Sequence, residues 1–383
     1  MADEDRKQIL ANVRRVVVKV GSGVLTRRNG LNLNIIDDLA TDICFLRKKG
    51  IEVILVSSGA VAAGLRKRGL TKRPDSLSQM QALAAMGQSN LIMAYEDAFA
   101  RHGSKAAQIL LTRDDLTNRR RYLNARNTLL TLLTWEIIPI INENDSVVVD
   151  ELKFGDNDNL SAMVTSLIES QLLINLTNID GLYNRDPRTN QDAEMISIVK
   201  KIDKEIFRMA DTIPGFLGTG GMASKITAAK KVALAGIPTI IANGMKPGVL
   251  KEIFSGKTVG SLILPAETSL GRKKHWIAFT KSPKGKVIID GGAEKALVKN
   301  GKSLLPSGIR SIRGKFSKGN TVLLVNEKNL SIAVGMVNYS SVELNRIKGV
   351  NSSEIESLLG YKNDDEVVHR DNLVFTSQLD EDG

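Results

Sequence analysis

Short apolar runs alternate with longer amphipathic stretches through most of the chain. Residues 16–20, 51–56 and 137–141 are aliphatic runs of strand length, whereas residues 33–49 and 79–99 repeat apolar positions at helical spacing. Strands that alternate with helices pair in parallel, and the carboxyl ends of those strands meet at one edge of the sheet. The pattern predicts an α/β fold with an open, mostly parallel sheet sandwiched by helices. Further strands are expected at 106–111, 172–176 and 237–242, and further helices at 61–68, 160–168 and 222–234.

The pattern changes after a looser stretch at 264–276, which we interpret as a linker. Beyond it, short apolar strands alternate with glycine-containing turns, and such a pattern predicts a small β-rich barrel or sandwich. The expected domains are therefore 1–268 and 276–371, followed by an acidic tail at 372–383. The late strands are expected at 285–289, 308–312, 321–325 and 332–337, with helical pieces at 292–300 and 340–346.

Composition narrows the range of functions. Aromatic residues make up 4% of the chain, which argues against a base-stacking platform for nucleic acid. One cysteine, Cys44, and three scattered histidines exclude a disulfide framework and a Cys/His zinc site. The charged N-terminus lacks an apolar signal core, and no run approaches the ~20 apolar residues of a membrane span. We therefore expect a cytoplasmic protein without a membrane partner.

Positive charge is concentrated in one late segment. The net charge of the whole chain is +11, and residues 272–362 hold 17 Lys or Arg against 6 Asp or Glu. Residues 363–383 hold 1 Arg against 7 acidic residues. Such a basic segment indicates either an anionic partner or a solvated surface. RNA is one partner of this kind, and its binding would weaken steeply with salt.

The stretch Gly155-Asp-Asn-Asp-Asn-Leu-Ser-Ala162 is the densest cluster of turn-forming and acidic residues. Asx residues and glycine favour tight turns, so the simplest interpretation is a helix start capped by Asp158 or Asn159. Similar turns elsewhere favour a functional interpretation, because Asn142-Glu-Asn-Asp145 and Gly218-Thr-Gly-Gly-Met-Ala-Ser-Lys225 follow or precede predicted elements of the same sheet. Acidic turns together with a glycine- and lysine-containing turn are typical of phosphoryl transfer.

Lys19 stands inside an otherwise apolar strand that leads into Gly21-Ser-Gly23. A buried lysine is costly unless its ammonium group emerges into a site, where it can reach an anion held by the glycine amides. The alternative is a strand-end lysine whose head reaches solvent. Ser58 follows the second strand and either caps the next helix or faces the same edge as Gly21. Lys225 lies in the first turns of a helix whose glycine-rich start can bind an anion.

These motifs resemble, in order and spacing, those of the glutamate 5-kinase branch of the amino acid kinase family, and the late segment resembles the PUA domain of its bacterial members. The resemblance implies an amino acid kinase catalytic domain that uses ATP and Mg²⁺ to phosphorylate the γ-carboxylate of L-glutamate, the first step of proline biosynthesis. It also implies feedback inhibition by proline and a homo-oligomer, a dimer or a tetramer. The motifs are VVVKVGSGVL, LVSSGAVAAG, IPIINENDSV, KFGDNDNLSA and GTGGMASK.

The resemblance also implies roles for individual residues. Lys19 and Lys225 would hold the transferring phosphoryl group, and Asp158 would hold the lysines. No protein metal ligand is implied, since Mg²⁺ would travel on the ATP phosphates. The family usually has Thr-Asp where this chain has Thr177-Asn178, so a charge-dependent role there is in question. Glutamate would be bound by Ser58, Asp145 and Asn157, and ATP by Lys19, Gly21, Thr177, Asn178, Thr219, Gly220, Gly221, Met222, Ala223, Ser224 and Lys225.

The chemistry of carboxyl phosphorylation agrees with this residue set. The reacting carboxylate and the γ-phosphate repel each other, so cations must bridge them, and two lysines plus Mg²⁺ supply that charge. The γ-carboxylate is already ionised at neutral pH, so no catalytic histidine or cysteine is needed. Two alternatives stay open: an RNA-binding protein acting through the basic PUA-like domain, and an amino-acid sensor of the same fold without catalysis.

Overall fold

The computed structural model describes residues 2–27, 30–147, 157–213, 221–266 and 283–379, together with 274, 277 and 278. The chain forms two compact units, Met1–Ser269 and Leu270–Gly383. In the described part of the chain, no helix has both the length and the apolar character needed to cross a membrane.

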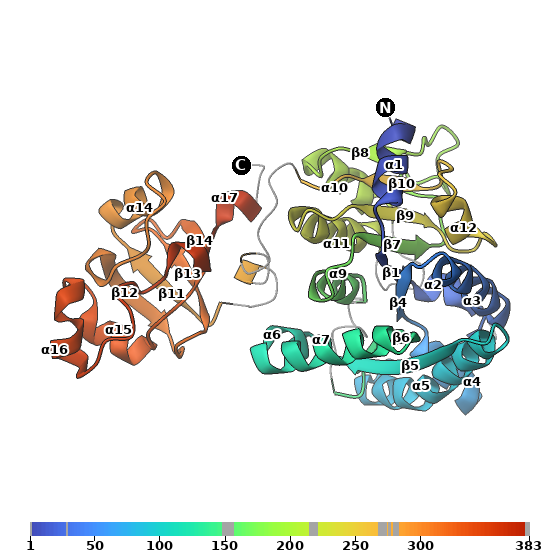
Figure 1. The fold of residues 1–383 in the computed structure, drawn as a ribbon, viewed down its shortest axis with the longest axis horizontal. Coiled ribbons are helices and arrows are strands. Elements are labelled where there is room, and N and C mark those ends of the chain that lie inside the picture. Colours follow the sequence, from blue (N-terminus) through green and yellow to red (C-terminus); the bar gives the residue numbers. More distant parts are fainter. Residues whose placement is uncertain are drawn as a thin grey trace. The chain divides into compact units, whose positions relative to one another are not determined.

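The first unit is built on an eight-stranded sheet with the strand order β5-β6-β4-β1-β7-β9-β10-β8 (Figure 1). Pairing is parallel from β5 through β9, whereas β10 runs antiparallel to β9. The prediction of an open, mostly parallel sheet is confirmed; the short strands β10 and β8, which end the sheet on the β9 side, were not foreseen. The strands are β1 (Arg15–Val20), β4 (Glu52–Ser57), β5 (Lys105–Leu111), β6 (Ile137–Glu143), β7 (Leu172–Thr177), β8 (Ile198–Val199), β9 (Thr239–Asn243) and β10 (Ser261–Ile263), with a separate hairpin of β2 (Thr26–Arg27) and β3 (Gly30–Leu31).

Helices cover both faces of this sheet, and the alternation of β1 shows how. Val16, Val18 and Val20 lie in the core beneath α3 and α5, whereas Val17 lies in the core formed with α7, α9 and α11. Side chains alternate between the faces of a strand, so Lys19 shares the α9 and α11 face with Val17. The helices are α1 (Ala2–Ala11), α2 (Ser22–Leu25), α3 (Leu33–Lys48), α4 (Ala60–Arg68), α5 (Leu77–Ala100), α6 (Arg113–Thr117), α7 (Arg119–Thr134), α9 (Asn157–Leu167), α10 (Lys204–Asp211), α11 (Met222–Leu234) and α12 (Val249–Phe254).

Helices α4 and α5 pack backbone against backbone at two glycines. A Cβ atom on Gly64 would lie 1.9 Å from the carbonyl oxygen of Leu83, and one on Gly87 would lie 1.8 Å from the carbonyl oxygen of Ala60. Both separations are far below van der Waals contact, so only glycine fits at either position. The close approach fixes α5 against the first residue of α4.

The second unit is a five-stranded sheet with the order β12-β11-β13-β14-β15 and flanking helices (Figure 1). Its core includes Val287, Leu324 and Tyr339. The prediction of a small β-rich unit is confirmed, and residues 373–375, in the stretch predicted to be tail, form a strand that pairs with β14. The elements are β11 (Gly285–Ile289), α14 (Gly291–Val298), β12 (Ile309–Gly314), β13 (Thr321–Val325), β14 (Ser331–Met336), α15 (Ser341–Ile347), α16 (Ile355–Leu359), β15 (Leu373–Phe375) and α17 (Thr376–Leu379).

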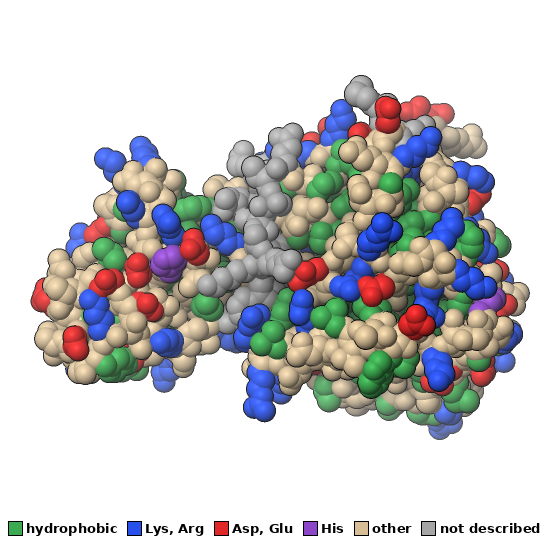
Figure 2. All heavy atoms as spheres, in the orientation of Figure 1, with side chains coloured by type: hydrophobic (Ala, Val, Ile, Leu, Met, Phe, Trp, Pro, Cys, Tyr) green, Lys and Arg blue, Asp and Glu red, His purple; other side chains and the backbone are tan. Residues whose placement is uncertain are grey.

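The second unit carries both acidic and basic side chains on its surface. On the face shown in Figure 2, acidic side chains are interspersed among the lysines and arginines. The second unit also contains ion pairs, for example Arg310 with Asp290 at 3.5 Å and Lys362 with Asp365. The basic excess of the sequence is therefore partly offset locally on this face.

Candidate active site

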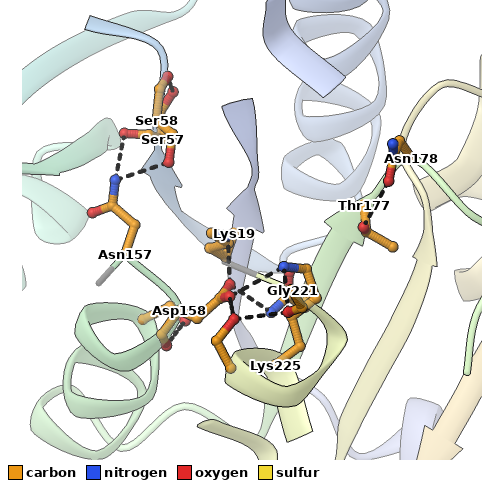
Figure 3. A network of polar contacts seen from close by, with 12 residues as sticks. Lys19, Ser57, Ser58, Asn157, Asp158, Thr177, Asn178, Gly221 and Lys225 are labelled. Carbon is orange, nitrogen blue, oxygen red and sulfur yellow. Dashed lines mark hydrogen bonds and ion pairs between the residues drawn. The ribbon is translucent and has the colours of Figure 1, made fainter. Parts of the chain in front are cut away.

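Asp158 is the centre of a buried ionic cluster at the start of α9 (Figure 3). Its Oδ1 lies 2.5 Å from the Nζ of Lys19, and its Oδ2 lies 3.1 Å from the Nζ of Lys225. The three residues come from α9, β1 and α11, and each is at most 6% exposed. The structure therefore brings together the two lysines and the carboxylate that the sequence singled out, and Lys19 does not reach bulk solvent.

Two neutral side chains complete the shell of Asp158. The Oγ of Ser224 donates to Asp158 Oδ2 at 2.6 Å, and the Nδ2 of Asn175 donates to Oδ1 at 3.1 Å. Asn175 was missed at the sequence level, although a signal existed. It is the one amide within the apolar run 172–176, and it lies directly opposite Lys19 in the pairing of β1 with β7.

The expectation that Asp158 or Asn159 caps the helix is wrong. Helix α9 already begins at Asn157, so both residues lie inside its first turn. The Asp158 carboxylate is turned toward the lysines, and the Oδ1 of Asn159 accepts a hydrogen bond from Lys231 Nζ at 2.5 Å. Both side chains therefore tie α9 to neighbouring elements instead of closing its own end.

Electrostatics favour the ionised form of Asp158. Burial alone would raise the pKa of its carboxyl, but the ammonium groups of Lys19 and Lys225 and the hydrogen bond from Ser224 outweigh burial and hold the pKa well below its ordinary value. With both lysines protonated, two positive charges face one negative charge. The cluster carries a surplus positive charge in a buried position, which is a favourable environment for an anion.

A second network lies beside the first and is built from amides and hydroxyls. The Nδ2 of Asn157 donates to Ser58 Oγ at 2.9 Å and to the Oδ1 of Asn142 at 2.8 Å. Gly59, with φ 111°, stands at the N-cap of α4 and directly follows Ser58. The structure therefore places Ser58 with Asn157 at the sheet edge, as the functional interpretation expected. Asn142, within the quoted Asn-Glu-Asn-Asp turn, joins them and was not proposed as a site residue.

Asp145 follows β6 in a turn and is 5% exposed. Burial raises the pKa of its carboxyl to about 7, although the charge of Arg73 acts in the opposite direction. Among the described residues, its Oδ1 has no hydrogen-bond partner. A buried carboxylate oxygen without a donor is costly, so a ligand ammonium group would satisfy it.

The expected nucleotide side is only partly described. The backbone amide of Gly21 donates to the carbonyl of Leu176 at 3.2 Å, and a Cβ atom on Gly21 would lie 3.6 Å from Lys19 Nζ. At the end of β7, Thr177 Oγ1 donates to Asn178 Oδ1 at 3.4 Å, and Figure 3 shows this pair to the right of the Lys19, Asp158 and Lys225 cluster.

The glycine-rich loop leads into α11. Gly221 is the N-cap of that helix, and its carbonyl oxygen lies 2.8 Å from Ser224 Oγ. Met222 is buried in the apolar core, so its side chain serves packing. Ala223 is partly buried and packs against the same core. Thr219 and Gly220 lie outside the described residues, as does the 155–156 part of the Asx-rich turn.

Metal-binding side chains do not gather in the part of the chain that the structure describes: no group of three or more His, Cys, Asp or Glu residues is placed to hold an ion there. The acidic residues nearest the lysines act as hydrogen-bonded or ion-paired groups. What the cluster can do chemically is to bind and neutralise anions.

The sequence model of the amino acid kinase family matches residues 14–243. This chain belongs to that family. The matched range contains Lys19, Asp158 and Lys225, so the ionic cluster lies wholly within the kinase-family part. A PUA domain model matches residues 285–359, which lie in the second unit.

Relatives of this amino acid kinase family member span nearly its full length. A protein named glutamate 5-kinase from Geobacter sulfurreducens is 54% identical over 370 residues, which cover 96% of this chain and 99% of the relative. Another of that name from Syntrophotalea carbinolica is 52% identical over 369 residues, with the same coverage. Among solved structures, the UMP kinase of Bacillus anthracis is 17% identical, with a TM-score of 0.47, covering 67% of this chain and 98% of that one.

Proposed function

We propose that this chain transfers the γ-phosphoryl group of ATP to the γ-carboxylate of L-glutamate and forms L-glutamyl 5-phosphate, the first step of proline biosynthesis. The observation that carries the proposal is the convergence of Lys19 and Lys225 on Asp158, at 2.5 and 3.1 Å. Relatives that cover 96% of the chain and bear the name glutamate 5-kinase support the choice of substrate.

The reaction is a direct displacement at phosphorus. An oxygen of the glutamate γ-carboxylate forms a bond to the γ-phosphorus while the bond to the ADP oxygen breaks, so no proton has to be removed from the nucleophile. Charge builds on the transferring group and on ADP, and the Lys19 and Lys225 ammonium groups neutralise it. Asp158 stays ionised and holds both lysines in place; it takes no proton, since its pKa is lowered.

Glutamate would be held by the second network. The Asp145 carboxylate would bind the substrate ammonium group, because its Oδ1 is buried and without a donor among the described residues. Ser58 and Asn157, joined at 2.9 Å, would bind the substrate through their polar groups. ATP would lie along Gly21, the Thr177-Asn178 pair and the segment 219–225, with its phosphates directed at the lysines.

Mg²⁺ would be held by the phosphates of ATP and would supply further positive charge to them. This assignment fits the donor set, since the described residues offer lysines and amides at the site and no grouped metal ligands. The chain's own share of the charge is therefore carried by Lys19 and Lys225.

The remaining assignments follow from the family. Residues 1–268 would form the catalytic domain and 276–371 the PUA-like domain, with an acidic tail after them. Feedback inhibition by proline, a dimer or tetramer and a cytoplasmic location are predictions of the same origin. RNA binding through the PUA domain is not favoured, because the relatives that span both units are named for the kinase activity.

A coupled assay of ADP release tests the proposed function. The protein is given ATP, Mg²⁺ and, in separate reactions, glutamate, aspartate, N-acetylglutamate or UMP. We expect turnover with glutamate alone, and hydroxylamine should trap the acyl phosphate as a hydroxamate. Preference for another acceptor, or ADP release without hydroxamate, would contradict the proposal.

A further inference from the structure

Helix α5 reaches the glutamate-binding side of the site at two points. Gln88 and Tyr95 are seven residues apart, which is about two helical turns, so their side chains leave the same face of the helix. Gln88 Oε1 accepts from Asn142 Nδ2 at 2.8 Å, and Tyr95 Oη lies 2.9 Å from Ser57 Oγ. Neither residue belongs to the motifs that carry the family resemblance.

The contact of Gln88 fixes a chain of amides. Asn142 Nδ2 donates to Gln88, so its Oδ1 is turned the other way, where it accepts from Asn157 Nδ2 at 2.8 Å and from the backbone amide of Glu143 at 2.9 Å. Asn157 Nδ2 in turn donates to Ser58 Oγ at 2.9 Å. An amide offers a donor on one side and an acceptor on the other, so the Gln88 acceptor and the Glu143 backbone donor together hold Asn142 in the orientation whose Oδ1 accepts from Asn157.

The contact of Tyr95 fixes the serine turn itself. Ser57 Oγ donates its single hydrogen to the carbonyl oxygen of Ser58 at 3.1 Å, so Tyr95 Oη is the donor to Ser57. Tyr95 and Ser57 are fully buried. On the other side of Ser58, Ala60 is pressed against Gly87 of α5. The turn that carries Ser58 is therefore held by α5 at both ends.

We propose that α5 positions the glutamate-binding groups of this protein, through Gln88 acting on Asn142 and Asn157 and through Tyr95 acting on the Ser57-Ser58 turn. The inference rests on the proposed function and adds two positioning residues to it. Neither side chain is assigned a contact with substrate. Both act on the orientation of groups that bind glutamate and leave the lysine cluster, which acts on the phosphoryl group, unchanged.

Two conservative substitutions in the full chain test the proposal. Gln88→Met keeps the length of the side chain and removes the acceptor, and Tyr95→Phe removes only the hydroxyl group. Losing one buried hydrogen bond in a binding network changes affinity by about tenfold. We therefore expect the KM for glutamate to rise about tenfold in each variant, while kcat and the KM for ATP stay within twofold. Gln79→Met, on an exposed position of the same helix, is the matched control and should leave all three constants unchanged.

A double-substitution cycle separates positioning from general damage. If Gln88 acts through Asn142, the Gln88→Met and Asn142→Ala changes together should raise the KM for glutamate no more than Asn142→Ala alone. Additive effects, an unchanged KM in the single variants, or a parallel loss of ATP affinity would each overturn the proposal. Should Gln88→Met not fold, Gln88→Leu provides the same loss of the acceptor.

Glutamate binding measured by calorimetry without ATP keeps this test separate from the proposed function. A protein that binds glutamate but fails to phosphorylate it would contradict the kinase proposal, and weaker binding in the Gln88→Met and Tyr95→Phe variants would still support positioning by α5. A wild-type chain that does not bind glutamate would overturn the inference.

Discussion

Lys19 and Asn175 lie opposite each other on adjacent parallel strands, and both bind the same oxygen of Asp158. The Lys19 ammonium is 2.5 Å from Asp158 Oδ1, and the Asn175 amide donates to it at 3.1 Å. The register of β1 with β7 therefore places the two side chains next to each other at the carboxylate. The site is part of the sheet, and a shift of either strand by one residue would dismantle it.

Replacing Lys225 by alanine should abolish most turnover without unfolding the protein. Asp158 keeps Lys19, Ser224 and Asn175 as partners, so the cluster stays assembled. Removing one charge that stabilises a transition state lowers kcat by about 100- to 1000-fold. The measurement is kcat at saturating glutamate and ATP, with circular dichroism for the fold. Lys230→Ala, on the same helix beside Phe207, is the control and should keep near-normal turnover. A Lys225→Ala variant as active as this control would refute the role.

Replacing Asp158 by asparagine should weaken the fold. Two buried ammonium groups then lose their only counter-charge among the contacts described for the cluster, and removing one partner of a buried ion pair costs about 3–5 kcal/mol. The free energy of unfolding in urea at pH 7 measures this loss. Asp180→Asn is the control, because its partner Lys246 is 55% exposed. The control should lose less than about 1 kcal/mol.

The pH dependence of that loss has a definite sign. The folded-state pKa of Asp158 is lowered, so the stabilisation it gives is fully present above the unfolded pKa of about 3.9 and is lost as pH falls toward the lower folded value. Wild type and Asp158→Asn should therefore differ most at neutral pH and converge only in strong acid. A difference that grows on acidification would contradict the assignment.

Glutamate affinity should rise with pH through the neutral range. Burial raises the pKa of Asp145 to about 7, and only the ionised carboxylate can pair with the substrate ammonium group. Below pH 7 the competent fraction falls, so the KM for glutamate should increase by up to about tenfold for each unit of acidification. The KM for ATP, measured in the same series, is the control and should change less. A flat profile between pH 6 and 8 would remove Asp145 from the site.

The same carboxylate should make the substrate-free protein less stable at high pH. Its folded pKa is raised, so the folded state binds more protons than the unfolded state between about pH 4 and 7, and stability falls as pH rises through that window. Asp145→Asn should be more stable than wild type at pH 8, by up to about 4 kcal/mol for a shift of about three units. Thermal melts without glutamate measure this gain. If wild type and Asp145→Asn differ in melting temperature by the same amount at pH 5 and at pH 8, the raised pKa of Asp145 is contradicted.

Replacing Gly87 by alanine should force α4 and α5 apart. The added Cβ would lie 1.8 Å from the carbonyl oxygen of Ala60, and backbone cannot move aside cheaply. We expect a loss of stability of about 3 kcal/mol or more. Gly291→Ala, at the start of α14 with open space around it, is the matched control and should be neutral or slightly stabilising. The free energy of unfolding of each variant is measured in urea, with fluorescence and far-UV circular dichroism as the two probes.

The hydrophobic pattern was enough to predict most of the sheet, because the central strands β1, β4, β6, β7 and β9 are mainly apolar and are buried along almost their whole length. It was not enough for β8 and β10, with two and three residues, since so few residues carry no periodicity. In the site, Lys19 stood out because a lysine is expensive in an apolar strand. Asn175 is also a polar residue in an apolar strand, but burying an uncharged amide costs less than burying a charge, so the sequence alone does not single it out.

The support from α5 could not be predicted from sequence. Gln88 and Tyr95 look like ordinary polar and aromatic positions of an amphipathic helix, and only the fold shows that this helix passes beneath the Ser57-Ser58 turn. The sequence motifs contain the residues that we expect to contact the ligands. The side chains that orient those groups depend on tertiary packing, which leaves no local pattern.

The internal pairing of Asp158 with both lysines has a consequence for the resting protein. Two buried ammonium groups without a counter-charge would attract inorganic phosphate, sulfate or chloride, and a bound anion would block the site. A carboxylate supplied by the chain occupies them beforehand, yet leaves one positive charge over. One net positive charge attracts a multiply charged phosphate chain more strongly than it attracts a monoanion. The Asp158 carboxylate thus weakens the binding of small anions to the two lysines when no nucleotide is bound.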